Sequence, residues 1–145
     1  MLKKEITYTD YNGDTRTESF YFHISKTELN DMDIDAGGTL ASKLTAMVEN
    51  RDAIGMAKFF RELIIRSYGE KSADGRFFDK GEDYALGKRF TRSAAFDSFY
   101  MDLFGDETGE KITAFVYGII PPDIAAQARA NTTPNVVVGE IGTEG

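Results

Sequence analysis

The feature that constrains this chain most is a helical repeat of apolar side chains between residues 51 and 66. The residues at this spacing are Ala53, Met56, Ala57, Phe60, Leu63 and Ile64. Phe59 and Ile65 widen the apolar face, so we expect this central helix to contact neighbours on more than one side. Glu62 and Arg66 form a pair of opposite charge four residues apart, which suits a solvated remaining face.

The chain begins with two segments of strand character, residues 2–9 and 15–24. An odd, three-residue loop at 12–14 would set Ile6 opposite Phe20, whereas a two-residue Asn-Gly loop would place these side chains on opposite faces. Because burial selects the register, we expect the odd loop and a hairpin that packs on helices. The apolar face would then hold Leu2, Ile6, Tyr8, Phe20, Phe22 and Ile24.

Helix start signals follow the hairpin directly. Ser25 and Glu28 have the spacing of a capping box, with Ile24 and Leu29 as the matching hydrophobic staple, so a first helix should begin at Ser25. A later helix should be capped by Asp106. Further helical segments are expected at 40–48, 82–91, 96–104, 106–119 and 123–130.

These patterns predict a mainly α fold of the α+β class, with an N-terminal β-hairpin packed on about five to six short helices. A chain of 145 residues suits one domain with a sizeable core, which we place at residues 1–130. Residues 131–145 have no helical period, so we expect a flexible C-terminal tail in the isolated monomer. The alternative is that the β-prone run Val136–Val138 pairs with another strand, such as one from a neighbouring chain.

Composition argues against several partners. The net charge is −7 and no Lys/Arg cluster offsets it, which disfavours binding to nucleic acid or to an anionic membrane surface. No apolar run approaches the length of a membrane span, and the N-terminus does not resemble a signal peptide. Without cysteine the chain has neither a disulfide framework nor a thiolate metal site, which fits a reducing cytoplasm.

Motifs that could carry chemistry do not meet their requirements. Asp31, Asp33 and Asp35 suggest a calcium loop, but its glycine and final glutamate positions are wrong, so a solvated acidic helix end is favoured. Residues 105–113 resemble a P-loop with the wrong spacing and fit a helix start better. His23 is the sole histidine and is expected to be a partly exposed strand residue. We therefore predict no catalytic, cofactor-binding or metal-binding residues.

The loop at residues 69–80 contains the adjacent aromatics Phe77 and Phe78 after a turn at Asp74-Gly75. Buried aromatics are commoner than exposed aromatic patches, so packing against the domain's own core is the favoured interpretation. The alternative is that the pair helps to make a docking surface.

Several stretches around this loop resemble the tail assembly chaperones of long-tailed, siphovirus-type bacteriophages. SYGEKSADGRFF, preceded by FFRELIIR and followed by FTRSAAFDSFYMDLF and FVYGIIP, carries the likeness. The opening YTDYNGDTRTESFYFHISKTEL is similar to theirs as well, so the resemblance covers about residues 1–122.

The resemblance implies a protein that is not an enzyme and needs no cofactor. It implies binding to the tape measure protein, which is kept soluble until tail tube subunits polymerise around it. It also implies action in the cytoplasm of the infected host and absence from the mature virion. Many such proteins have a longer form made by ribosomal frameshifting near the end of the gene. That longer form and self-association are further partner expectations.

Candidate partner-binding residues must be apolar and placed where a groove could form. Phe59 and Ile65 on the flank of the central helix, with Phe77 and Phe78 in the loop, meet this condition. Two other function classes stay open. One is a small structural virion protein for head–tail or tail completion. The other is a small enzyme with two facing carboxylates of perturbed pKa.

Overall fold

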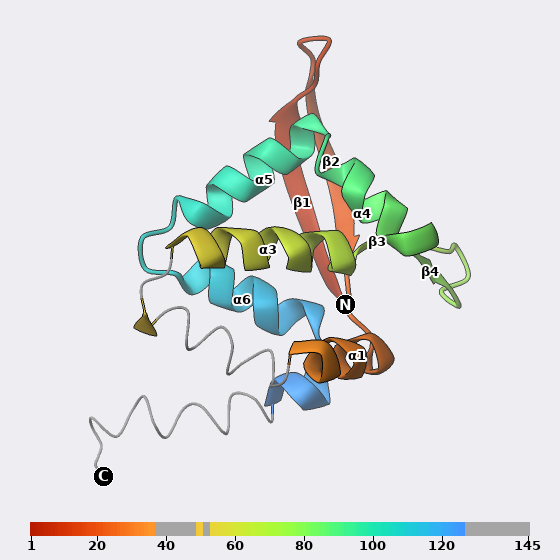
Figure 1. Cartoon of the computed structure of the whole chain (residues 1–145). Coiled ribbons are helices and arrows are strands. Elements are labelled where there is room, and N and C mark those ends of the chain that lie inside the picture. The colour runs from red at the N-terminus through yellow and green to blue at the C-terminus, as the bar shows by residue number, and fades with distance from the viewer. Residues whose placement is uncertain (37–48, 51–52, 127–145) are drawn as a thin grey trace.

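The computed structural model describes residues 1–36, 49–50 and 53–126 (Figure 1). An antiparallel sheet lies on one side of a set of helices, as expected for a mainly α fold with an N-terminal hairpin. The strands are β1 (Leu2–Thr9), β2 (Thr15–Phe22), β3 (Tyr68–Lys71) and β4 (Phe78–Asp79). The helices are α1 (Lys26–Ala36), α3 (Ala53–Ser67), η1 (Glu82–Tyr84), α4 (Ala85–Phe90), α5 (Ala94–Phe104) and α6 (Glu110–Ile119).

The first hairpin has the predicted faces but a different register. Ile6 is buried and Phe22 is fully buried, whereas Glu5 and Thr7 on the opposite face are exposed. Phe20 packs against the same core, so the predicted grouping of these aromatics with Ile6 is confirmed. The predicted pairing of Ile6 with Phe20 is wrong, because Ile6 pairs with Glu18 and Phe20 with Lys4. A shift of two residues preserves the faces because side chains alternate with period two.

The loop chemistry explains this shift. The Asp10 N–H donates to the carbonyl of Asp14 (2.8 Å), so the odd loop consists of residues 11–13 rather than 12–14. Its last residue must adopt a left-handed conformation, which Gly13 does with φ 89°. The Asp10 carboxylate fixes the turn by accepting from the N–H groups of Asn12 and Asp14 (2.9 and 3.0 Å).

The sheet has four strands instead of the predicted two, which corrects the sequence-based expectation. The stretch expected to be a loop after the central helix forms a second hairpin of β3 and β4. Tyr21 pairs with Gly69, and the N–H of His23 donates to the carbonyl of Ser67 (2.8 Å). The turn predicted at Asp74-Gly75 lies at the tip of this second hairpin.

The core is aromatic, as the abundance of phenylalanine and tyrosine indicates. Phe22 stacks on Phe99 at 5.2 Å between ring centroids and contacts Phe115 edge-on at 5.5 Å. Phe60 from α3 contacts the same Phe115 at 5.4 Å. The sheet, α3, α5 and α6 therefore share one continuous core (Figure 1).

The helices of the structure are compared here with the predicted helix starts and ends. Ser25 and Glu28 make the capping box, with N···O distances of 3.0 and 3.1 Å. The predicted helix over 82–91 is broken into η1 and α4, because Asp83 and Tyr84 adopt left-handed conformations. Asp106 is not the N-cap of α6. Gly109 holds that position, and the Asp106 carboxylate instead accepts from the N–H of Lys111 (3.0 Å).

Two predicted helices extend outside the described residues. The segment 40–48 lies entirely outside them. Residues 122–126 are helical at the start of the predicted segment 123–130, and the rest of that segment is outside as well. Within the described part of the chain, no helix has the length and apolar character needed to cross a membrane.

Candidate partner-binding surface

The tip of the second hairpin is ordered by its own hydrogen bonds. The N–H of Ser72 donates to the carbonyl of Phe77 (2.9 Å), and the N–H of Phe77 donates to the Ser72 hydroxyl (3.0 Å). The N–H and Nε of Arg76 donate to the Asp74 carboxylate (3.1 and 2.9 Å). Hydrogen bonds from the Arg76 backbone, from Ser72 and from the Arg76 side chain lower the pKa of Asp74. Gly75 supplies the left-handed turn with φ 78°.

Phe77 is displayed to solvent by this ordered tip. Its side chain is 66% exposed, and the guanidinium carbon of Arg76 lies 5.5 Å from its ring centroid. A cation over the ring face stabilises the exposed aromatic only modestly at such an open site. The backbone of Phe77 is therefore fixed by hydrogen bonds while its side chain stays exposed, which lowers the ordering cost if the ring makes a contact.

Phe78 has the opposite environment. It is half-buried, its ring meets His23 edge-on at 6.3 Å, and Lys80 Nζ lies 5.8 Å from its centroid. A Cβ on Gly69 would approach the Phe78 ring to 2.7 Å, so the glycine is what lets this ring lie across the strand. Phe78 therefore packs on its own domain, as the favoured interpretation expected, whereas Phe77 faces outward. The docking role of this pair stays a prediction.

The other two predicted partner-binding residues lie on α3. Phe59 is partly buried and packs against the core, and Ile65 is also half-buried. Six residues separate them along the helix, so they point to different sides of it. The structure thus distributes the four predicted residues over α3 and the β3–β4 hairpin (Figure 1) and does not gather them in a single groove.

A partly buried ion pair that sequence reasoning missed joins the base of the hairpin to two helices. Lys80 Nζ donates to both carboxylate oxygens of Glu28 (2.8 and 2.9 Å) and to the carbonyl of Arg66 (2.6 Å). The rings of Phe78 and Tyr84 each lie 5.8 Å from the same Nζ. This cluster, here called the Lys80 latch, joins α1, the end of α3 and the residue after β4.

In the Lys80 latch, burial and ion pairing shift the pKa values of Lys80 and Glu28 in opposite directions. The Lys80 side chain is 11% exposed, and burial lowers the pKa of its ammonium group. Burial alone would raise the pKa of Glu28, but hydrogen bonds from Lys80 and Ser25 outweigh it and lower that pKa. The carboxylate is thus held in its charged form, and loss of its charge would leave Lys80 desolvated without a counter-ion.

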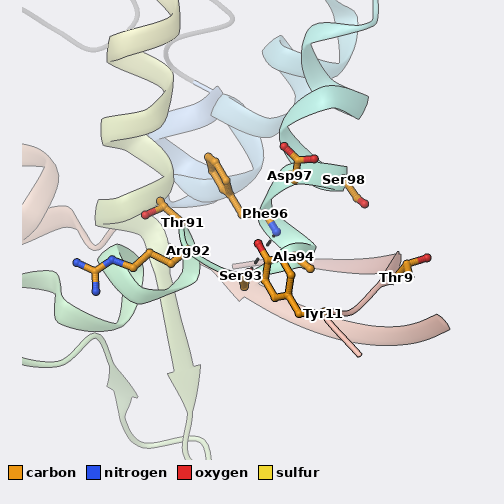
Figure 2. A pocket seen from close by; sticks show the side chains of 9 residues that line it. All are labelled: Thr9, Tyr11, Thr91, Arg92, Ser93, Ala94, Phe96, Asp97 and Ser98. Atoms are coloured by element: carbon orange, nitrogen blue, oxygen red, sulfur yellow. Dashed lines mark hydrogen bonds between the residues drawn. The ribbon is translucent and has the colours of Figure 1, made fainter. Parts of the chain in front are cut away.

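A shallow hollow of about 550 Å³ lies between the tip of the first hairpin and the start of α5 (Figure 2). Its lining residues are Thr9, Tyr11, Thr91, Arg92, Ser93, Ala94, Phe96, Asp97 and Ser98. The Ser93 hydroxyl caps α5 by accepting from the N–H of Phe96 (3.2 Å), so it serves the helix. Asp97 is the one carboxylate in this lining, so the hollow does not contain the pair of acids that an acid–base mechanism requires.

His23 packs as a structural side chain. Burial lowers its pKa, and its Nδ1 has no hydrogen-bond partner among the described residues. Across residues 1–36, 49–50 and 53–126, no group of three or more histidine, aspartate or glutamate side chains is placed to hold a metal ion. The described surface also carries the exposed aromatic Phe77 on a hairpin tip whose backbone is ordered by hydrogen bonds.

Comparison with known families identifies the class of protein. Residues 1–140 match the family model described as phage tail assembly chaperone, and the chain belongs to this family. The resemblance noted in the sequence is confirmed, and the match extends beyond the residues that first carried it. No match is found among curated proteins, and none among solved structures.

Proposed function

We propose that this phage tail assembly chaperone binds an apolar helical segment of the tape measure protein and keeps it soluble until the tail tube polymerises around it. Family membership supports a role in tail assembly, and the chemistry of the second hairpin supports apolar binding. The proposal includes no catalytic step. It places the protein in the host cytoplasm during assembly and outside the finished virion, together with a frameshifted longer form.

The observation that carries this proposal is the ordered display of Phe77. Binding normally requires side chains and loops to lose conformational freedom, and a loop already fixed by its own hydrogen bonds loses less. Aromatic side chains that enter a partner's pocket from such a position are typical binding hot spots. Arg76 beside the ring adds a cation that can meet an acidic residue flanking the partner's apolar site.

The magnitude expected for Phe77 follows from its exposure. Burying a whole phenylalanine side chain is worth about 1.5–3 kcal/mol, so burying the 66% that is exposed is worth about 1–2 kcal/mol. Removing the ring should weaken binding by about 5- to 30-fold. Three half-buried side chains have less exposed surface to contribute and would act as secondary contacts: Phe59, Ile65 and Phe78.

The test is co-expression with the tape measure protein, followed by pull-down at low and high salt. Apolar binding should survive high salt, because screening weakens exposed charge pairs and leaves burial intact. Phe77→Ser should weaken binding by this factor and lower the recovery of the partner, whereas Tyr11→Ser, a control at the 84% exposed tip of the first hairpin, should leave recovery unchanged. The proposal fails if the tape measure protein is soluble alone, if salt dissociates the complex, or if both variants bind equally. Finding the protein in purified virions would favour the structural alternative.

A further inference from the structure

Helices α3 and α5 lie together on the side of the molecule away from the sheet. Figure 1 shows both helices in front of the sheet, converging where α3 begins and α5 ends. Long side chains join them: Phe60 of α3 meets Phe104 of α5 edge-on at 5.3 Å between ring centroids. The guanidinium carbon of Arg61 lies 5.7 Å from the ring centroid of Tyr100. Solvent-facing groups of the two helices therefore belong to one surface.

The contribution of α5 to this surface is a row of aromatic side chains. The ring centroid of Phe96 lies 5.5 Å from that of Tyr100, and Tyr100 stacks on Phe104 at 4.5 Å. These three residues follow at intervals of four, so they lie along one side of the helix, and all are half-buried. Met101 stands beside the row and is 61% exposed. A second amphipathic helix suits such a row, because its own apolar contacts recur every three to four residues.

The contribution of α3 is a basic flank. Intervals of four, three and four residues place Ile54, Lys58, Arg61 and Ile65 on one side of the helix. The contact of Arg61 with an α5 ring shows that this flank faces α5. α4 covers its far end, since a Cβ on Gly87 would lie 1.9 Å from the Ile65 carbonyl oxygen. Lys58 and Arg61 are exposed, and Ile54 is 73% exposed, so the open part of the flank combines two cations with an apolar side chain.

This surface, here called the α3–α5 face, consists of Ile54, Lys58, Arg61, Tyr100, Met101 and Phe104. We propose that it binds an amphipathic helix of the tape measure protein whose apolar stripe is flanked on one side by acidic residues. The inference rests on the proposed function and names the docking surface and the chemistry of the bound segment.

Charge complementarity is the argument for this occupant. Although the chain has a net charge of −7, the two exposed side chains nearest the aromatic row on α3 are the cations Lys58 and Arg61. On α5 the exposed charge beside the row is the carboxylate of Asp97, which helical spacing places on the side away from the core. An apolar stripe that covers Tyr100 and Met101 would bring its acidic flank to α3. A helix of the reverse direction would bring the same acids to Asp97, which disfavours it.

The α3–α5 face and the tip of the second hairpin are separate contacts. β3 starts at Tyr68, directly after the last residue of α3, whereas α3 and α5 converge near the first turn of α3 (Figure 1). Phe77 at the hairpin tip and Met101 on α5 would therefore touch different parts of the partner. Loss of either contact should weaken the complex without abolishing it, so the two can be tested independently.

Site-specific photocrosslinking tests which molecule covers the face. A benzoylphenylalanine is placed at Met101 of the full-length chaperone, which is co-expressed with the tape measure protein. It should give an adduct with that protein, whereas the same group at Thr17, exposed on the other side of the sheet, should not. A complex that is recovered without an adduct at 101 overturns the inference and leaves the proposed function standing. Adducts to a second copy, or within one chain, also overturn it, and the absence of any complex overturns both proposals.

Binding kinetics of two variants test the chemistry of the bound segment. Met101→Ser should weaken binding by about 5- to 20-fold, because its exposed 61% is no longer available for burial. Arg61→Glu should slow association by about threefold or more at low salt, and the difference should shrink at high salt. Lys71→Glu is the matched control: it makes the same change of charge on the opposite side of the sheet, where Lys71 Nζ lies 5.9 Å from the Tyr21 ring centroid. Equal association rates for the two charge variants, or unchanged binding by Met101→Ser, would show that the inference is wrong.

Discussion

Replacing Glu28 tests whether the Lys80 latch holds the hairpin base, as the geometry indicates. Glu28→Ala removes the counter-ion of Lys80 and leaves its ammonium group with the Arg66 carbonyl as the remaining oxygen partner of the latch. It also removes the acceptor for the Ser25 N–H (3.0 Å) in the capping box. Both interactions exist only in the folded state, so removing them should decrease the free energy of unfolding.

The magnitude follows from burial. Breaking a fully buried ion pair by removing one partner costs about 3–5 kcal/mol. Here the two side chains are 11% and 24% exposed, so water relieves part of this penalty and we expect about 2–3 kcal/mol. Loss of the capping hydrogen bond adds about 0.5–1 kcal/mol. Glu28→Ala should therefore cost about 2.5–4 kcal/mol, and Glu28→Gln, which keeps an acceptor for Ser25, should cost less.

Urea denaturation followed by far-UV circular dichroism measures these values, since the chain has no tryptophan for fluorescence. Lys88→Ala breaks the exposed pair with Asp83 and should leave stability nearly unchanged. Adding Lys80→Met to Glu28→Ala should restore stability, because no unpaired charge then stays buried. The reasoning is refuted if Glu28→Ala costs no more than Lys88→Ala, or if the double variant is no more stable than Glu28→Ala.

The same latch predicts a response to acid. The folded-state pKa of Glu28 lies below its usual 4.5, so its stabilising contribution is complete above 4.5 and is lost as the pH falls through the lower folded value. The difference in stability between the wild type and Glu28→Gln should therefore shrink in acid. A difference that stays constant across this range would mean that the carboxylate charge contributes nothing.

Two further substitutions test other parts of the fold. Gly87→Ala should destabilise strongly, by about 3 kcal/mol or more, because its Cβ would lie 1.9 Å from the Ile65 carbonyl oxygen. Gly118→Ala meets only the flexible side chain of Leu2 and should change the urea midpoint little. His23→Phe should remove one contribution to the pH dependence: burial lowers the pKa of His23, so this group makes the wild type lose stability as the pH falls below 6.5, and the variant lacks that loss. Equal midpoints for both glycine variants, or an unchanged pH profile for His23→Phe, would contradict these arguments.

Local signals in the sequence predicted local structure well. The capping box at Ser25 and Glu28 forms with both hydrogen bonds, because it involves residues three apart on one turn. The faces of the first hairpin were predictable because a register shift of two residues leaves them unchanged. The register itself was missed, since it depends on which residue adopts the left-handed conformation. The glycine at position 13 takes it, and the loop ends there.

Features that depend on distant pairing could not be read from the sequence. β3 has four residues and pairs with the edge of β2, and the two-residue β4 pairs in turn with β3. Glu28 and Lys80 are 52 residues apart and look like ordinary surface charges until the fold removes water from them. The different exposure of Phe77 and Phe78, by contrast, could have been predicted from the sequence, because adjacent residues entering a strand point to opposite faces.

The two edge strands of the sheet, β1 and β4, differ in how readily they could pair with another copy of the chain. This difference matters for a chaperone that also exposes an apolar side chain. The β4 edge is short, and the aromatic beside it, Phe77, has Arg76 over its ring and a charged loop around it, which limits self-association. The β1 edge is four times as long and would invite pairing between copies if left open. Lys3 and Glu5 reduce that tendency without removing it, because charged side chains do not occupy the backbone groups.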